Sequence, residues 1–150
     1  MIKIKDYKEA LTEIIAKVNK ESGSVLQINN IPILSPDEKA FSKKIAEQGG
    51  LILGGSYPPD DTDSADEDSF APEYDCLLFL IKKIDLSNIT DQELEQFYDN
   101  VADLMRLIID HIRENDFGCD KQIHSLGKFH TEWESNYGGF YGKSVSFTLQ

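Results

Sequence analysis

The sequence predicts an α+β fold, in which a mixed, mostly antiparallel sheet of about four to five strands has two main helices packed on one face. Three observations lead to this class. An apolar run at residues 76–81 is typical of a buried strand. The longest helical pattern follows it, over about residues 90–115. The chain closes with strict two-residue alternation at residues 144–149, which is typical of a strand with one buried face.

Length and charge limit the number of domains and the kinds of partner that the protein can bind. The 150 residues are enough for a single domain, 1–150, with one core. A net charge of −12 argues against nucleic-acid binding and against an anionic membrane surface, because both are bound through Lys and Arg. No apolar run reaches the roughly 20 residues of a membrane span, and the first residues lack the apolar core of a signal peptide. We therefore expect a soluble protein that is made in a cytoplasm.

The first helix is predicted over residues 6–19. Asp6 and Glu9 resemble a capping pair at its start, and Gly23 can end it in the left-handed conformation. Its apolar face consists of residues that recur every three or four positions, namely Tyr7, Leu11, Ile14, Ile15 and Val18.

Short elements are predicted in the next segment. Residues 24–28 are a strand candidate, and residues 31–34 belong to a sheet edge or a loop because Pro32 cannot donate a hydrogen bond. A short helix with Ser35 as its cap is expected to reach about Gln48. Residues 50–55 and 74–83 are expected to pair as antiparallel strands.

A long acidic segment lies between these two strands. Prolines, small residues and repelling carboxylates predict a mobile surface loop over about residues 57–72. The segment lacks the Gly and the Glu that an EF-hand requires, so a solvated loop is favoured over a calcium site. Its negative charge suits a basic partner. The candidate interface residues here are Asp60, Asp61, Asp63, Asp66 and Asp68.

The long helix is predicted to begin with a capping box made by Thr90 and Glu93. Its apolar positions recur every three or four residues, so it is expected to cover the sheet together with the first helix. The predicted core is formed by one face of each element and includes Leu11, Ile15, Leu53, Leu78, Leu80, Phe97, Val101, Leu104, Ile108, Val145 and Phe147.

The segment after the long helix is rich in aromatic residues and glycine. A short strand is predicted near residues 122–126, and a glycine turn within residues 136–142 leads into the last strand. Two interpretations of the aromatic residues stay open: they cover the sheet of a hairpin, or they form an exposed patch for a partner subunit. The candidate interface residues are Trp133, Tyr137, Phe140 and Tyr141.

No pattern of residues indicates catalysis or a cofactor. The glycine pairs are not followed by the GK[ST] of a phosphate loop, and no GxSxG nucleophile motif is present. Cys76 is expected to be a small core residue, and no disulfide is expected. No zinc-site spacing is found among His111, Cys119, His124 and His130. We therefore predict a non-enzymatic protein without a metal or a cofactor.

The C-terminal layout resembles the end of small proteins from phage and prophage structural modules of Bacteroidetes. In those proteins a polar D/N-x-x-x-G turn leads into a last strand of the form V-x-F-x-L, which here is Val145, Phe147 and Leu149. The order of elements is also similar to that of tail-terminator and head–tail connector (neck) proteins, mainly over residues 74–150. This resemblance implies a homo-oligomeric ring at the head-proximal end of a phage tail, in contact with other tail or neck proteins. It also implies assembly in the host cytoplasm followed by a place in the virion.

Function classes can therefore be ordered. A ring-forming virion structural protein stands first, since a negative lumen would let DNA pass without sticking. The alternative is a small acidic immunity or inhibitor-type protein that captures a basic partner by electrostatic steering. An enzyme stands last, because the sequence nominates no pocket of convergent titratable groups. The oligomeric state distinguishes the first two.

Overall fold

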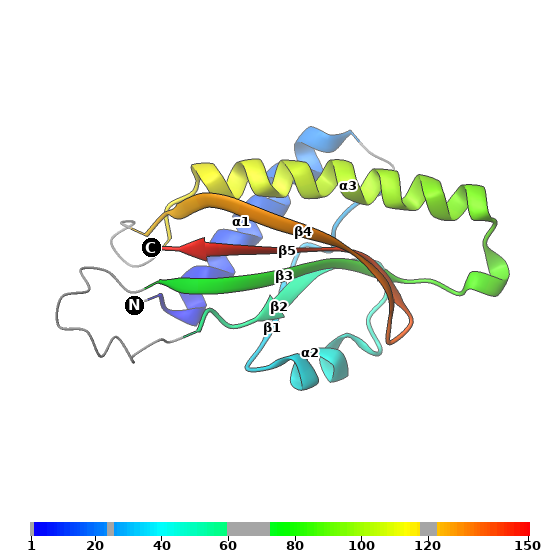
Figure 1. Cartoon of the computed structure of the whole chain (residues 1–150), viewed down its shortest axis with the longest axis horizontal. Coiled ribbons are helices and arrows are strands. Elements are labelled where there is room, and N and C mark those ends of the chain that lie inside the picture. The colour runs from blue at the N-terminus through cyan, green and yellow to red at the C-terminus, as the bar shows by residue number, and fades with distance from the viewer. Residues whose placement is uncertain (1, 24–25, 60–72, 118–122) are drawn as a thin grey trace.

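The computed structural model describes residues 2–23, 26–59, 73–117 and 123–150. Within these ranges it confirms the α+β class, with three α-helices and a five-stranded sheet (Figure 1). The elements in chain order are α1 (Ile4–Ser22), β1 (Ile33–Ser35), α2 (Glu38–Ile45), β2 (Leu51–Ser56), β3 (Tyr74–Lys83), the 3-10 helix η1 (Leu86–Asn88), α3 (Asp91–Glu114), β4 (Ser125–Tyr137) and β5 (Phe140–Leu149).

The sheet has the strand order β1-β2-β3-β5-β4. β1 runs parallel to β2 and the other neighbours are antiparallel, so the sheet is mixed and mostly antiparallel, as predicted. The expected pairing of β2 with β3 is confirmed, with Leu53 opposite Leu80. β5 lies between β3 and β4. The last strand of the chain is therefore internal, and β1 and β4 form the two edges.

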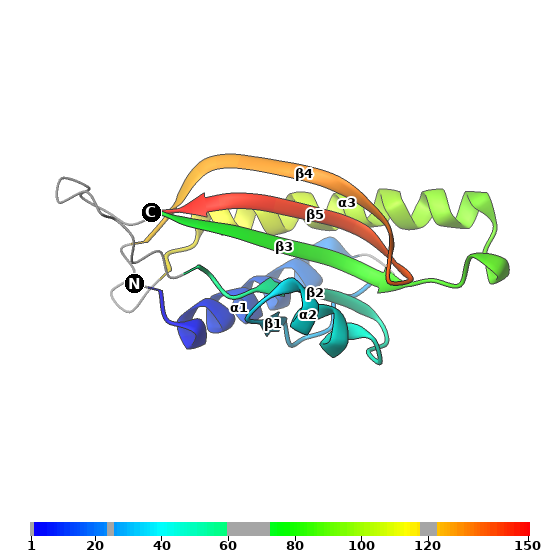
Figure 2. The same cartoon turned by 60° about the horizontal axis from the view of Figure 1, so that its bottom comes forward.

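One face of the sheet, which we call the two-helix face, is covered by α1 and α3 (Figures 1 and 2). Alternate strand residues point to this face, among them Leu78 in β3 and Val145 in β5, because side chains alternate across a strand. The whole predicted core is confirmed as buried in this one cluster, namely Leu11, Ile15, Leu53, Leu78, Leu80, Phe97, Val101, Leu104, Ile108, Val145 and Phe147.

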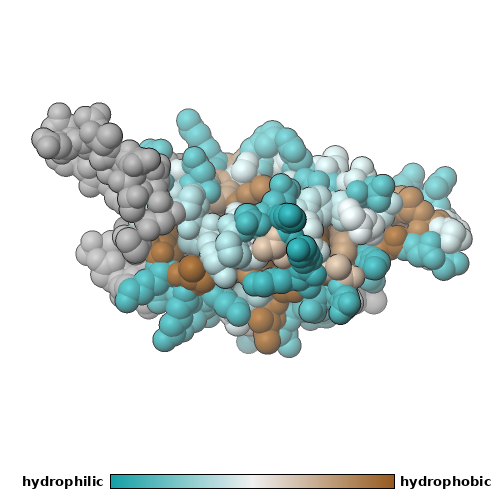
Figure 3. Space-filling model, turned by 90° about the horizontal axis from the view of Figure 1, so that it is seen from below, coloured by the Kyte–Doolittle hydropathy of each residue, from teal (hydrophilic) through white to brown (hydrophobic). Residues whose placement is uncertain are grey.

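The opposite face, which we call the one-helix face, carries only α2. Phe41 and Ile45 of this helix are buried in a second, smaller cluster with residues of β2, β3 and β5. A Cβ atom at Gly54 would overlap the carbonyl oxygen of Ile33 and lie 2.9 Å from the Phe41 ring, so this glycine permits the close packing. Figure 3 views the molecule from the side on which α2 lies in Figure 1, and its surface there is mainly hydrophilic, with hydrophobic residues in separate spots.

The start of the first helix differs from the prediction. α1 begins at Ile4, and Lys3 precedes it without a side-chain capping bond, so the capping pair of Asp6 and Glu9 is wrong. Asp6 lies inside the first turn, where a negative charge suits the helix dipole. The predicted end is confirmed, since Gly23 has a φ of 55° in the left-handed region.

The start of α2 also differs. Its cap is Asp37, whose carboxylate accepts a hydrogen bond of 2.8 Å from the Ala40 amide. Ser35 is instead the last residue of β1, so its predicted capping role is wrong. Serine and aspartate are both favourable N-cap residues. The backbone of Ser35 is paired with β2, so Asp37 caps the helix instead.

The capping box of α3 is confirmed. The Glu93 amide donates to the Thr90 hydroxyl at 3.1 Å, and the Thr90 amide donates to the Glu93 carboxylate at 3.3 Å. From this start α3 runs for 24 residues.

One strand prediction is wrong and another is only partly correct. Residues 24–28 form no strand in their described part, where Ile28 makes a single bridge to Leu51. The predicted short strand near residues 122–126 is correct only at residues 125–126, which begin β4, a strand of 13 residues from Ser125 to Tyr137. β4 lies at a sheet edge, where a strand needs no continuous apolar face, and this explains why its polar sequence concealed it.

The acidic segment falls largely outside the described residues. The described part of the predicted loop begins with Tyr57, whose amide donates to the Ser35 carbonyl at 2.8 Å. The acidic interface candidates lie outside the described residues, namely Asp60, Asp61, Asp63, Asp66 and Asp68. In the described part of the chain, no helix has both the length and the apolar character needed to cross a membrane.

Candidate functional site

The four aromatic interface candidates belong to a β4–β5 hairpin with a two-residue turn. Gly138 and Gly139 form that turn with φ values of 58° and 87°, which L-residues rarely adopt. Phe140 and Tyr141 are buried within the chain, at 2% and 7% exposure. The hairpin interpretation is therefore confirmed, and the exposed-patch interpretation is wrong for these two residues.

Tyr137 connects the hairpin to α2. Its ring stacks on Phe79 with centroids 4.9 Å apart. Its hydroxyl donates to the Glu38 carboxylate at 3.2 Å and lies 3.2 Å from the Ser42 hydroxyl. Burial raises the pKa of Tyr137, and the hydrogen bond with Ser42 lowers it in part. These contacts give Tyr137 a role in holding α2 on the sheet.

Trp133 is the candidate that remains open to a partner, with 56% exposure. It lies on the two-helix face at the rim of the sheet, and its ring meets the Tyr98 ring of α3 edge to face, with centroids 5.2 Å apart. The Lys143 ammonium lies 4.2 Å from the Trp133 ring centroid. Tyr98 in turn donates a hydrogen bond of 2.8 Å to the Glu134 carbonyl. Trp133 is thus exposed but held in one orientation.

The backbone beside Trp133 faces outward. His124 and Gln150 exchange two hydrogen bonds, of 2.9 and 2.8 Å, at the far end of the β4–β5 pair. Residues of β5 that bond to β4 alternate with residues that bond to β3, because the register of β5 with β3 is unbroken. Counting back from Gln150 in steps of two reaches Ser146 and Ser144. Their partners on β4, His130 and Glu132, therefore bond inward.

It follows that Phe129, Thr131 and Trp133 turn their backbone N–H and C=O groups to the open side of β4. We call residues 128–134 of this strand the β4 edge. Its side chains divide by face: Phe129 and Trp133 lie on the two-helix face, while His130 and Glu132 lie on the other face. The register with β5 is irregular on either side of the regular stretch, between Ser125 and Phe129 and between Glu134 and Tyr137.

Three charged or titratable side chains of the β4 edge are exposed, namely Lys128, His130 and Glu132. Lys128 and His130 line a shallow hollow together with Ser146 and Thr148 of β5. Lys128 makes no ion pair within the described part of the chain. His130 Nε2 lies 3.0 Å from Glu132 Oε1, and both side chains are well exposed, at 72% and 65%.

The other edge of the sheet is closed. β1 has three residues, and the preceding residue is Pro32, which has no N–H to donate. The Lys44 ammonium donates a hydrogen bond of 2.7 Å to the Leu34 carbonyl. A proline and a lysine are both common protections of an edge strand.

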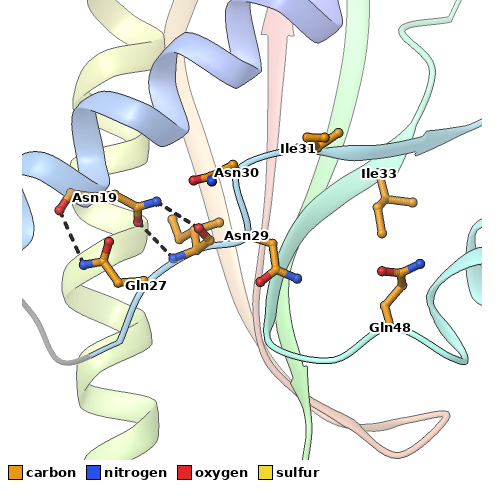
Figure 4. Close-up of a pocket in the computed structure, with 8 residues that line it drawn as sticks. Asn19, Gln27, Asn29, Asn30, Ile31, Ile33 and Gln48 are labelled. Carbon is orange, nitrogen blue, oxygen red and sulfur yellow. Dashed lines mark hydrogen bonds between the residues drawn. The ribbon is translucent and has the colours of Figure 1, made fainter.

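Another hollow is an amide-lined cleft of about 730 Å³ between α1 and the segment before β1 (Figure 4). The Asn19 side chain exchanges two hydrogen bonds with the Ile28 backbone, of 2.8 and 2.9 Å. The Asn29 amide donates to the Gly49 carbonyl at 2.7 Å. These amides therefore fix the chain segment between α1 and β1. The cleft has no titratable lining residue: it is lined by Asn19, Gln27, Ile28, Asn29, Asn30, Ile31, Ile33 and Gln48.

The three histidines lie apart from one another, each with its own carboxylate. His111 of α3 contacts Glu21 of α1 at 3.0 Å, and His124 contacts Asp116 at 2.6 Å. Cys119 lies outside the described residues. Among the residues that the structure describes, no three His, Cys, Asp or Glu side chains gather closely enough to hold a metal ion.

Cys76 is buried at 4% exposure, which confirms its place in the core. Burial raises the pKa of its thiol to about 12. Burial likewise raises the pKa of Tyr7 well above its ordinary value, and the nearby Cys76 thiol adds to this shift. The Tyr7 hydroxyl has no hydrogen-bond partner of normal geometry within the described residues. This pair is sealed in the core and is not placed to act on a ligand.

Comparison with known proteins adds no relative: no protein-family model, no curated protein and no solved structure matches the chain.

Proposed function

We propose that this chain is a non-enzymatic assembly subunit that acts through contacts with other protein subunits. The observation that carries the proposal is the β4 edge, where outward backbone groups run beside the exposed ring of Trp133. An unprotected edge strand is a ready template for another chain, and natural proteins usually protect such edges. On β1 a proline and a lysine supply this protection. The regular part of β4 contains no proline; Lys128 lies on it, register irregularities flank it, and Tyr98 binds the carbonyl of Glu134 at its end.

The state of Trp133 also favours a protein partner. Tryptophan is enriched among the residues that dominate protein–protein binding energy. Tyr98 and Lys143 already restrict the Trp133 ring, so less conformational entropy is lost when a partner covers it. The arrangement is that of a preorganised contact.

We propose a ring at the head-proximal end of a phage tail, of the tail-terminator or neck kind, as the particular assembly. Its support is the C-terminal sequence resemblance, together with the net charge of −12, which suits a lumen that passes DNA. In such a ring the chain would contact copies of itself and other tail or neck proteins.

The test is the solution mass of the purified chain, measured by light scattering and native mass spectrometry over a range of concentrations. We expect a closed oligomer of several 17.0 kDa subunits. Trp133→Glu should shift the mass towards the monomer, because it places a charge in the contact. Leu86→Glu is the matched control, since Leu86 is also exposed, at 48%, but lies in η1.

A chain that stays monomeric at every concentration would contradict the assembly proposal. That outcome would favour the alternative, an acidic protein that captures a basic partner by electrostatic steering.

A further inference from the structure

We infer that two copies of this chain pair antiparallel through their β4 edges, about a two-fold axis at Thr131, and join two five-stranded sheets into one. The inference rests on the proposed function in one respect, that the β4 edge is an assembly surface. It goes further by naming the occupant of that edge, a second copy of the chain, and the register of the contact.

The backbone supports this register. With the axis at Thr131, this residue faces its own copy, and Phe129 faces Trp133 of the second copy. These are the residues whose N–H and C=O groups point outward, so donors meet acceptors along the contact. The Cα atoms of a bonded antiparallel pair lie about 5.5 Å apart, which sets the expected spacing at the axis.

The charges support the same register. Lys128 would face Glu134 of the second copy, and His130 would face Glu132. The two-fold axis repeats each pair, so two Lys–Glu ion pairs and two His–Glu contacts follow from one strand sequence. Among the described residues of one chain Lys128 has no ion pair, and it would gain one on pairing.

The aromatic residues complete the match. On the two-helix face, the half-buried Phe129 would lie opposite the exposed Trp133 of the second copy, and Thr131 would lie opposite Thr131. Aromatic pairs directly across an antiparallel contact stabilise it.

Neighbouring registers are less favourable. An axis at Glu132 would place two carboxylates opposite each other, and like charges directly across strands destabilise the pairing. An axis at His130 would leave this residue without a carboxylate opposite it. Both alternatives also lose the facing of Phe129 with Trp133.

The closed β1 edge excludes the head-to-tail alternative. If β4 of one copy joined β1 of the next, its backbone groups would meet Pro32 and the Leu34 carbonyl already bound by Lys44. On the other side of the sheet, Figure 2 shows β4 as the outermost strand, with α3 behind it. A self-complementary contact at one edge is therefore the arrangement that these two edges permit.

Cysteine cross-linking tests the register directly. In a Cys119→Ser background, Thr131→Cys should form a covalent dimer under mild oxidation, because the expected Cα separation falls within the roughly 4.4–6.8 Å of disulfides. His130→Cys and Glu132→Cys should not cross-link alone but should do so when mixed. Leu86→Cys, exposed at 48%, gives the rate of random collision. The remaining native thiol, Cys76, is buried.

A charge exchange tests the same contact without oxidation. Lys128→Glu should weaken dimerisation at least tenfold, and adding Glu134→Lys to it should restore the pairing. Glu134 also accepts a hydrogen bond of 2.8 Å from the Ser144 hydroxyl, so Ser144→Ala is the control and should leave the dimer constant unchanged.

Four results would overturn the inference. Cross-linking by His130→Cys or Glu132→Cys alone would indicate another register. Failure of every cysteine pair in a chain that still forms an oligomer would reject the β4 contact and leave the proposed assembly function intact. A closed ring with an odd number of equivalent chains would also reject it, because an isologous contact requires an even number. A monomer under all conditions would reject both proposals.

Discussion

Both faces of the sheet are covered by helices, but the two faces bury clusters of very different size. The two-helix face buries most of the core under α1 and α3, and these helices contact each other through His111 and Glu21. On the one-helix face, the described buried cluster has six residues, two from α2 and four from the strands, and α2 itself has eight residues. Because burial of apolar area is the main stabilising contribution, stability should depend chiefly on the first face and local order on the second.

The strongest test of this comparison is Leu104→Asp on the two-helix face. Leu104 is 1% exposed, so the substitution buries an unpaired carboxylate, at a cost comparable to the about 5–15 kcal/mol that stabilises a typical domain. We expect the variant to be unfolded, as measured by circular dichroism. Arg106→Asp is the matched control: its side chain is 72% exposed, and the variant should melt close to wild type. A folded Leu104→Asp with wild-type melting would refute the placement.

Phe41→Ala breaks the one-helix face and should have a smaller, local effect. Phe41 is 1% exposed and stacks on Phe79 at 5.6 Å, so truncation should cost about 3–5 kcal/mol and leave a cavity. Hydrogen exchange should show lost protection in α2 while α3 stays protected. Phe97→Ala, the same change on the other face, should lower protection throughout α3 and the sheet. If the two variants lost hydrogen-exchange protection in the same elements, the proposed difference between the two faces of the sheet would be wrong.

The smallest expected effect is a pH dependence of stability that comes from Cys76, a buried residue of the two-helix face. The pKa of Cys76 rises from its ordinary value of 9.0 to about 12 in the folded chain. Below pH 9.0 both states hold the proton, and the full stability is present. Above it the unfolded chain releases the proton first, so stability falls as pH rises towards 12.

Cys76→Ala should therefore be slightly less stable at neutral pH, by about 1 kcal/mol, yet lose stability less steeply in alkali. Urea unfolding at neutral pH and at about pH 10.5 measures the difference. Part of the alkaline loss should remain, because the raised pKa of Tyr7 acts in the same direction. Identical slopes in wild type and variant would show that the thiol does not titrate with unfolding.

Local patterns predicted the two-helix face well, for a physical reason. Thr90 and Glu93 mark the start of α3 by bonds that need no tertiary context. Leu78 and Val145 lie in strands whose alternation can be followed directly in the sequence. Elements that bury a continuous apolar face carry their own signal.

The candidate site was only partly predictable, because it depends on tertiary pairing. Trp133 was recognised as a candidate, but Phe140 and Tyr141 face inward only because the turn at Gly138 sets the register of the hairpin. The β4 edge could not be found from the sequence, since its polar residues resemble a loop and its exposure depends on β5 lying between β3 and β4. Strand order of this kind is set by long-range contacts, which no local pattern reports.

The unequal edges of the sheet also bear on how far the protein can polymerise. A subunit that can extend its sheet at both ends has a valence of two and grows into a fibre. Pro32 and Lys44 close one edge of this sheet, so pairing through the β4 edges would join two sheets and no more. In the dimer that we infer, the joined sheet would end in β1 on both sides, and any larger assembly would use other surfaces. One edge strand can thus stay available for pairing at high subunit concentration without forming the extended fibres to which sheets with two open edges are prone.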